Sequence, residues 1–279
     1  MEKQKNYNQF SKEYNALYLQ NILSFQKKVK ENGRARDYYV DFYPSFGVAE
    51  NEYADFLIYG QAVNGWISGF EPEKVVTDAH VDKSIASSNE YFEPLGHNPL
   101  DWVNVQWDKY SMEEYKLKHE GIKNYYSGKY RANRSFFWNV TYKLINDFYG
   151  FNRNEPNWSS KMVWSNLHKI APEDANPNDY ETNVQMDYSI KLFEQEIKEV
   201  NPKFCIILTN GKWWEPFGKA LLEKFPTHNH LPSKIDYCEQ IRSTKIIVTK
   251  RPRFAGHDLQ DMFVNQILSL INQSDFKNV

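Results

Sequence analysis

The chain has 279 residues, of which 41% are hydrophobic and 25% charged, a composition typical of a folded globular protein. The net charge of −2 provides no overall attraction for a polyanion, so binding of nucleic acid would require a local basic patch. Only two cysteines occur, Cys205 and Cys238, and they exclude a disulfide framework and any four-cysteine metal or iron–sulfur site.

Aromatic residues make up 16% of the chain, which fits either a bulky core or stacking surfaces for planar ligands such as nucleobases. The first residues are polar, without the apolar segment of a signal peptide, and no apolar run approaches the roughly 20 residues that span a bilayer. We therefore expect a cytoplasmic protein without membrane association, folded as a single α/β domain over residues 1–279.

The first element expected in chain order is a helix from about residue 7 to residue 30. Apolar and aromatic residues recur there at three- and four-residue spacing, and Asn32-Gly33 supplies a C-terminal stop. We expect residues 1–50 to form an N-terminal helical extension that packs on the sheet of the main domain.

A short buried strand is predicted next, at residues 56–59. Its four apolar or aromatic residues follow one another without interruption, as in a parallel strand covered on both faces. The strand runs into Gly60, and the chain continues through Gln61–Trp66, which contains a second glycine. Because glycine lets a ligand approach the main chain, and ligands bind at the carboxyl ends of such strands, we expect Gln61–Trp66 on the floor of a site.

The segment from residue 67 to residue 130 follows no regular pattern and contains scattered prolines, glycines and aromatics. Long irregular segments in compact domains are usually functional or contain short helices. A basic cluster towards its end is either a solvated helix face or a patch that contacts phosphates. Its members are Lys116, Lys118, Lys123, Lys129, Arg131 and Arg134, with Tyr125, Tyr126 and Tyr130 between them.

Strands and helices alternate through the rest of the chain. Ser135 is predicted to cap a helix that ends at Gly150, and Phe137 lies on its apolar stripe. The further predicted elements are strands at residues 162–172, 203–211 and 244–254 and helices at residues 186–200, 216–224 and 259–271. This alternation predicts the α/β class, as a three-layer α/β/α sandwich with a central four-stranded parallel sheet.

Polar or glycine-containing residues follow each of the four predicted strands, and in a parallel sheet all four ends meet at one edge. A buried amide such as that of Asn166 can present both a donor and an acceptor to the edge of a base. One asparagine at a strand end is more often a turn or cap residue, but the convergence of four ends favours a site. The four groups are Gly60-Gln61 with Asn64, Asn166 with His168, Thr209-Asn210-Gly211, and Arg251-Pro252-Arg253 with His257.

The order of these motifs resembles that of the uracil-DNA glycosylase superfamily. IYGQAVNGW stands where that family has a glycine-rich loop that activates a water, and VWSNLHKIAP is similar to its second-strand motif with a base-reading asparagine. LFEQEIKEVNPKFCIILTNG resembles the helix and third strand that come next, and IIVTKRPRFAGH occupies the place of the late His-Pro motif. The resemblance extends in order from Phe56 to Ile271 and implies a uracil-DNA glycosylase-like fold.

The resemblance also implies site residues for a nucleotide that is flipped out of the DNA duplex. The catalytic candidates, which would hold the water or steady the departing base, are Gln61, Asn64, Arg251 and His257. The base-binding candidates are Asn166, Trp66, Phe137 and His168. The candidates for contact with nucleic acid are Asn210, Arg253, Phe254, Lys129, Arg131 and Arg134. Phe254 is expected to wedge into the base stack that the flipped nucleotide leaves. For Phe254, Trp66 and Phe137 the alternative is ordinary core packing.

The chain departs from the family pattern at two positions that matter for catalysis. Gln61-Ala62-Val63 stands where the family has an acidic residue or asparagine, and an amide can orient a water but cannot take its proton. Arg251 stands where the family has histidine, and its charge is fixed. Two functions therefore remain open: a DNA glycosylase that hydrolyses an N-glycosidic bond in DNA repair, or an inactive relative that binds a nucleotide, a nucleic acid or a protein partner.

A third possibility is an enzyme of another class, in which a carboxylate of the irregular segment supplies the missing base. The candidates are Glu71, Glu73, Asp78 and Asp101. No cofactor and no metal are expected, because the chain lacks a P-loop, a dinucleotide-binding glycine motif and a zinc-protease motif, and His228-Asn229-His230 lacks surrounding ligands.

Overall fold

A computed structural model of the chain describes residues 9–48, 52–62, 66–90, 99–100, 103, 134–151, 158–222, 231–251 and 256–273. Within these residues six strands form the central sheet, in the order β2 (Ser45–Phe46), β5 (Met162–His168), β3 (Phe56–Ala62), β7 (Phe204–Ile207), β9 (Thr244–Thr249) and β8 (Ile235–Ile241). The four inner strands, β5, β3, β7 and β9, run parallel to one another, and β2 and β8 pair antiparallel at the two edges.

The α/β class is confirmed, but the predicted sheet of four parallel strands is too small. The missed edge strands gave no clear periodic signal: β2 has two residues, and β8 mixes buried, half-buried and exposed positions without alternation. A second, antiparallel sheet was also missed, in the order β4 (Gly69–Phe70), β1 (Tyr39–Asp41) and β6 (Ile170–Pro172). The predicted strand of residues 162–172 therefore divides at Lys169 between the two sheets.

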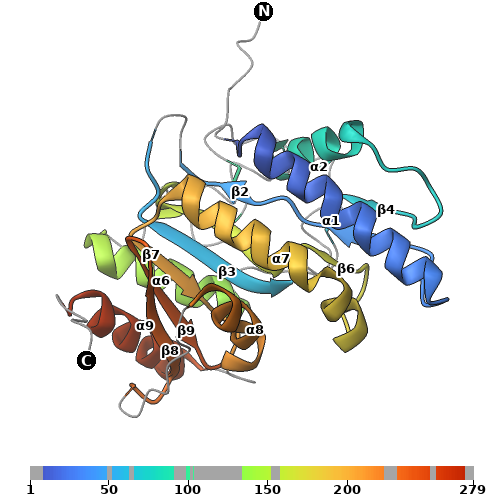
Figure 1. Cartoon of the computed structure of the whole chain (residues 1–279). Coiled ribbons are helices and arrows are strands. Elements are labelled where there is room, and N and C mark those ends of the chain that lie inside the picture. Colours follow the sequence, from blue (N-terminus) through green and yellow to red (C-terminus); the bar gives the residue numbers. More distant parts are fainter. Residues whose placement is uncertain are drawn as a thin grey trace, which may run out of the picture.

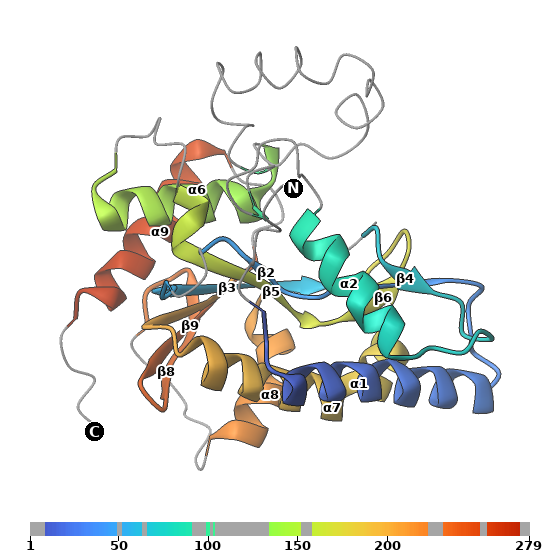
Figure 2. The ribbon, with the colours of Figure 1, turned by 90° about the horizontal axis from the view of Figure 1, so that it is seen from above.

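Helices cover both faces of the central sheet. On one face lie α1 (Lys12–Glu31), α7 (Asp179–Val200) and α8 (Gly211–Leu221), and on the other α6 (Phe136–Tyr149) and α9 (His257–Ile271), as Figure 2 shows from above. The helix α2 (Asp78–Glu90) lies near α1 (Figure 1). A 3-10 turn, η3 (Trp158–Lys161), precedes β5. The first 50 residues contribute β1 and β2 to the two sheets as well as the predicted helix.

β3 is buried on both faces, as its unbroken apolar sequence predicted. Leu57 and Tyr59 belong to the core under α1, α7 and α8, whereas Phe56 and Ile58 belong to the core under α6 and α9. The strand continues to Ala62, so Gln61 is part of the strand and not of a turn as expected. Its parallel pairing with β5 places Gly60 opposite Asn166.

Two helices begin earlier than predicted because of polar capping. α7 begins at Asp179, where Asn178 and Glu181 form a reciprocal capping box. α8 begins at Gly211, because the side chain of Asn210 accepts a hydrogen bond from the backbone N–H of Trp213. α6 ends at Gly150, as predicted, and this glycine adopts the left-handed conformation. The hydroxyl of Ser135, which was predicted to cap the helix, makes no capping hydrogen bond.

A buried ion pair joins the sheet to α1 and α7. Lys169 Nζ lies 2.7 Å from Glu196 Oε1, and the two side chains are 1% and 0% exposed. The carboxylate of Glu196 also accepts hydrogen bonds from Tyr14 in α1, Tyr59 in β3 and Ser165 in β5, at 2.6 to 2.7 Å. Lys169 donates further to Ser165 Oγ and to a backbone carbonyl, so both charges have a full set of partners. Burial lowers the pKa of Lys169, and the nearby Glu196 carboxylate opposes that shift.

Replacement of Lys169 by methionine should lower the free energy of unfolding by about 3 to 5 kcal/mol, because it leaves the Glu196 carboxylate buried without its charge partner. The control is Lys198→Met, which removes an exposed lysine whose contact with Glu13 joins the same two helices at 3.7 Å. This control should cost less than about 1 kcal/mol. Urea unfolding of both variants measures the difference, and equal losses would contradict the structural role of the buried pair.

Candidate functional site

The four parallel strands direct their carboxyl ends to one edge of the sheet. The order in which the chain adds strands changes direction at β3. From β3 the chain passes through α6 to β5 on one side, and then through α7 to β7 and onward to β9 on the other side. Ligands of open α/β sheets bind at such a reversal, outside the carboxyl ends of the strands. The predicted site residues that follow β3, β5, β7 and β9 therefore belong to one edge of the sheet.

Gly60, Asn166 and Phe137 meet at this edge. A Cβ atom built on Gly60 would lie 2.4 Å from Oδ1 of Asn166 and 3.7 Å from Cε2 of Phe137. Any larger residue at position 60 would therefore displace the amide of Asn166. The glycine creates the space in which β5 can place a carboxamide against the main chain of β3, with an aromatic ring of α6 beside it.

The amide nitrogen of Asn166 is the unsatisfied polar group of this cluster. The side chain is 2% exposed, and its Nδ2 has no hydrogen-bond partner among the described residues. A buried donor without a partner costs about 1 to 3 kcal/mol relative to one that is hydrogen-bonded. Such a cost at a strand end is explained if a ligand or a water supplies the acceptor.

Gln61 and Arg251 form a second polar group at the same edge. Arg251 Nη1 donates to Gln61 Oε1 at 2.6 Å, which links the end of β3 to the second residue after β9. Side chains alternate along a strand, so Gln61 leaves β3 on the side opposite to the space at Gly60. The structure therefore brings Gln61 to Arg251 but gives no contact between Gln61 and Asn166.

The two aromatic residues among the base-binding candidates, Trp66 and Phe137, differ in exposure. Trp66 is 8% exposed and packs edge-on against Phe42 and Trp164, with ring centroids 5.1 and 5.4 Å away. Phe137 is only partly buried, and it contacts Trp138 edge-on at 4.9 Å. Phe137 thus retains ring surface beside Asn166, whereas Trp66 is mainly a core residue.

His168 lies away from the cluster at Gly60. Its ring is fully buried against Trp213 and Phe217 of α8, and Nδ1 lies 3.2 Å from Ser189 Oγ of α7. Burial lowers the pKa of His168 to about 3, with a smaller contribution from the charge of Lys169. The ring is therefore neutral at pH 7. Its contacts are those of a packed core histidine, although its Nε2 has no hydrogen-bond partner among the described residues.

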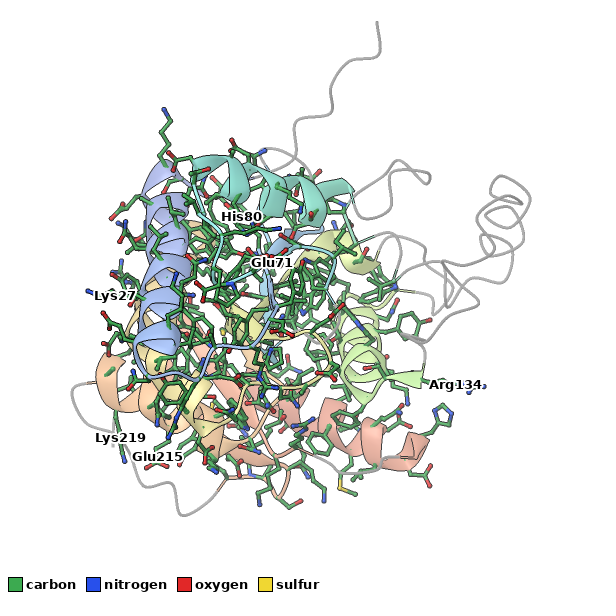
Figure 3. The ribbon with its side chains drawn as sticks, turned by 90° about the vertical axis from the view of Figure 1, so that its right-hand side faces the viewer. Lys27, Glu71, His80, Arg134, Glu215 and Lys219 are labelled. Atoms are coloured by element: carbon green, nitrogen blue, oxygen red, sulfur yellow. The ribbon has the colours of Figure 1, made fainter. Side chains whose placement is uncertain are left out.

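Three other predicted site residues are placed at the surface or at helix starts. Asn210 is used as the cap of α8, as a strand-end asparagine often is. His257 is the exposed first residue of α9. Arg134 is exposed just before α6 and extends away from the body of the protein (Figure 3). The remaining candidates, Asn64, Arg253, Phe254, Lys129 and Arg131, lie outside the described residues.

The described carboxylates among those considered as an alternative base are exposed and make no hydrogen bond with Asn166. Glu71 is exposed and pairs with Lys74 at 2.7 Å, and Glu73 is exposed and lies 3.6 Å from Lys30. Asp78 is an exposed residue at the start of α2. Asp101 lies outside the described residues.

Sequence reasoning missed a second buried polar cluster, between β1 and α2. Asp41 Oδ2 lies 2.6 Å from His80 Nε2 and accepts a hydrogen bond from Ser84 at 3.0 Å. The serine hydroxyl contacts the aspartate rather than the imidazole, so this arrangement lacks the serine–histidine contact of a nucleophilic triad. Asp41 and His80 are 39 positions apart in different elements, and no local motif announces their contact.

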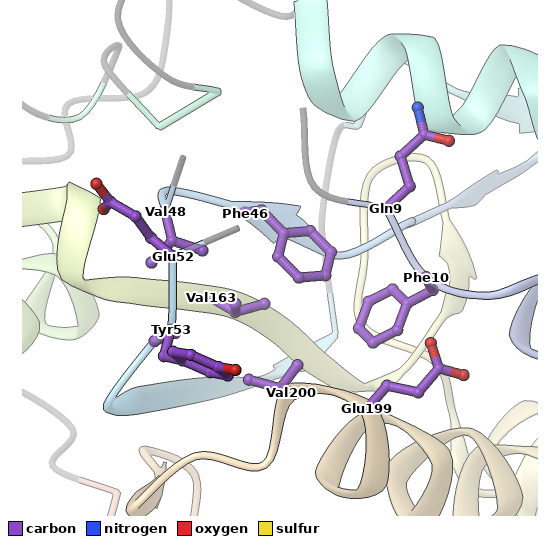
Figure 4. A pocket seen from close by; sticks show the side chains of 10 residues that line it. Gln9, Phe10, Phe46, Val48, Glu52, Tyr53, Val163, Glu199 and Val200 are labelled. Carbon is purple, nitrogen blue, oxygen red and sulfur yellow. The ribbon is translucent and has the colours of Figure 1, made fainter. Parts of the chain in front are cut away.

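A cavity of about 180 Å³ lies at the opposite, amino-terminal edge of the central sheet (Figure 4). Its walls include Phe10 and Phe46, whose ring centroids are 4.8 Å apart. Glu199 also lines it, but its carboxylate already accepts hydrogen bonds from Ser11 and Gln195. The unsatisfied donor of Asn166 nevertheless makes the carboxyl-terminal edge the stronger candidate for a site.

No model of a known protein family matches the chain, and no curated protein matches it. Among the described helices, none is long and apolar enough to cross a membrane. Within the same part of the chain, no group of three or more His, Cys, Asp or Glu residues is placed to hold a metal ion.

Replacement of Gly60 by alanine should lower the free energy of unfolding by about 1 to 3 kcal/mol, because the new Cβ overlaps the amide of Asn166. The matched control is Gly256→Ala, where a Cβ meets no atom within 4 Å. Chemical denaturation of both variants provides the test. If the two alanines had the same effect, the close approach of Asn166 to Gly60 would be contradicted.

His168 should make the protein less stable as the pH falls below about 6.5. The unfolded histidine binds a proton below this pH, whereas the buried ring does not do so until about pH 3. The unfolding free energy should therefore fall by up to about 1.4 kcal/mol per pH unit between these limits, in addition to the effects of other groups. His168→Gln should remove this part of the slope, and the exposed control His257→Gln should retain it. Parallel pH curves for wild type and His168→Gln would exclude the effect.

Proposed function

We propose that the chain is a divergent uracil-DNA glycosylase-like protein that binds a nucleobase of DNA or a related nucleic acid. The observation that supports this proposal most directly is the buried amide of Asn166, with its unpartnered Nδ2 beside Gly60 and Phe137. Asn166 is also the residue to which the sequence resemblance assigns base recognition. The proposal places the base at the carboxyl-terminal edge of the central sheet, between β3, β5 and α6.

Each of the three residues has a distinct physical role in the proposed complex. Asn166 Nδ2 donates a hydrogen bond to an acceptor on the base edge, which removes the cost of the unsatisfied donor. The ring of Phe137 stacks on the base, a contact worth about 1 to 3 kcal/mol. Gly60 provides the space in which the Asn166 amide lies against β3 and is held beside Phe137.

Binding fits the described residues better than hydrolysis does. Gln61 cannot remove a proton from a water, and its carbonyl oxygen already accepts a hydrogen bond from Arg251. Glu71, Glu73 and Asp78 are exposed, and Glu71 and Glu73 lie near the cations of Lys74 and Lys30. Base excision is therefore the second function, and it would require a proton acceptor from the part of the chain that the structure does not describe.

A base in duplex DNA has to leave the stack before it can reach this edge. Flipping costs a few kcal/mol in a matched duplex and less at a mismatch or in a single strand. The net charge of −2 gives no general attraction that offsets this cost. The proposed ligand is therefore a single-stranded or mismatched nucleic acid rather than a matched duplex.

The test measures binding of labelled single- and double-stranded oligonucleotides that carry uracil, hypoxanthine or a mismatch, together with release of the free base. Asn166→Ala should weaken binding about 10-fold or more without loss of stability, because the amide it removes has an unsatisfied donor. The exposed Asn272 at the end of α9 provides the control, and Asn272→Ala should bind as the wild type does.

The outcomes separate the two functions. Binding that depends on Asn166, without release of the base, supports the binding protein, and release that Asn166→Ala abolishes supports a glycosylase. Binding that is unchanged in Asn166→Ala, or no binding by the wild type at low salt, would refute a base site at Asn166.

A further inference from the structure

The hydrogen bond between Arg251 and Gln61 connects the ends of β3 and β9 and passes over the end of β7, the strand between them. In the sheet β7 separates β3 from β9, and neighbouring strands lie about 4.8 Å apart, so the bridge crosses about 10 Å. Tyr59, Ile207 and Val248 form one row of paired positions across these three strands. Gln61 and Arg251 both lie beyond this row, and β7 ends at it, so the bridge passes over the end of β7.

The polarity of the bridge follows from the chemistry of its two groups. A guanidinium has only donors, so Gln61 must present its oxygen to Arg251 and direct its Nε2 elsewhere. The remaining hydrogen-bonding groups of the pair, the other N–H groups of Arg251 and the amide nitrogen of Gln61, are therefore all donors. The acceptor of the pair, Gln61 Oε1, is already used by Arg251. A ligand bound there therefore has to supply hydrogen-bond acceptors, such as oxygen atoms.

The bridge also orients Arg251 without neutralising it. The oxygen of Gln61 is uncharged, and among the described residues no carboxylate pairs with Arg251. An arginine that is oriented by a neutral partner keeps its full charge for a ligand, whereas an ion pair would cancel much of it. The start of α8 also carries a partial positive charge, but its backbone N–H at Gly211 already donates to the carboxylate of Asp236 at 2.7 Å. It is therefore less available to an anionic ligand than Arg251 is.

We propose that Arg251 binds a phosphate group of the ligand and that Gln61 is the positioning residue that orients its guanidinium. The inference rests on the proposed function, since it places the phosphate of a nucleotide beside the base site at Asn166. It assigns the base to the side of β3 that faces α6 and the phosphate to the end of β7. A nucleotide that spans this edge would contact both groups at once.

The experiment compares dissociation constants for uridine, uridine 5′-monophosphate and inorganic pyrophosphate, measured by calorimetry on the full chain at low salt. Wild type should bind the monophosphate about 10-fold more tightly than the nucleoside, as expected for a charge-assisted contact. Arg251→Met should abolish this preference and the binding of pyrophosphate. Lys250→Met removes the same charge from the neighbouring exposed position and should retain the preference.

Two variants of Gln61 test the positioning role. Gln61→Glu keeps a bridge to Arg251 but pairs it with a carboxylate, so it should reduce the phosphate preference nearly as much as Arg251→Met. Gln61→Met leaves the arginine charged but unoriented, so it should reduce the preference about 3-fold. Equal phosphate preference in Gln61→Glu and wild type would overturn the assignment.

Failure of the proposed function is distinguishable from failure of this inference. If Asn166→Ala binds uridine as the wild type does, while Arg251→Met loses the phosphate preference, the base site is wrong and the phosphate site stands. If uridine binding depends on Asn166 and the phosphate adds no affinity, the base site stands and the inference is refuted. If the wild type binds none of the three probes, both are refuted.

Discussion

The buried pair of Lys169 and Glu196 is the interaction on which the arrangement of the core depends. Glu196 is fully buried in α7, yet its carboxylate is matched by one cation and three hydroxyl donors. The hydroxyls belong to Tyr14, Tyr59 and Ser165, which come from α1, β3 and β5. A desolvated charge is tolerated only when it has such partners, so these four elements have to meet in one specific arrangement. Burial of apolar surface supplies most of the stability, and this network specifies which surfaces are buried together.

The same network fixes the backbone at the proposed site. Lys169 Nζ donates to the backbone carbonyl of Asn166 at 2.6 Å, on the face of the sheet that α7 covers. The side chain of Asn166 points to the other face, towards Gly60 and Phe137. The residue is thus held by the core through its main chain, while its amide is directed towards the proposed base site. Precise sites are built on elements that packing and hydrogen bonds have already immobilised, and β5 meets this requirement.

The sequence was sufficient to predict the parts of the structure that have a local cause. The apolar runs of β3, β5, β7 and β9 and the capping glycine of α6 each announce an element, and parallel strands necessarily direct their carboxyl ends to one edge. Contacts between distant elements gave no such signal. Gln61 and Arg251 are 190 positions apart, and Tyr59 and Glu196 are 137 apart. Their pairing depends on strand order and on side-chain direction, which a single sequence does not specify.

Asn166 differs from Glu196 and Asn210 in having an unsatisfied polar atom, a property that it shares with other buried side chains such as Asn21 and His168. The carboxylate of Glu196 has its hydrogen bonds within the core, and Asn210 uses its side chain to cap α8. Asn166 is as deeply buried, but its amide nitrogen lacks a partner among the described residues. Because an unmet donor lowers stability, its presence at a strand end that adjoins the reversal of strand order favours a binding role. The exposed Arg251 is also available to a ligand at this edge, since the neutral oxygen of Gln61 orients its guanidinium without cancelling its charge.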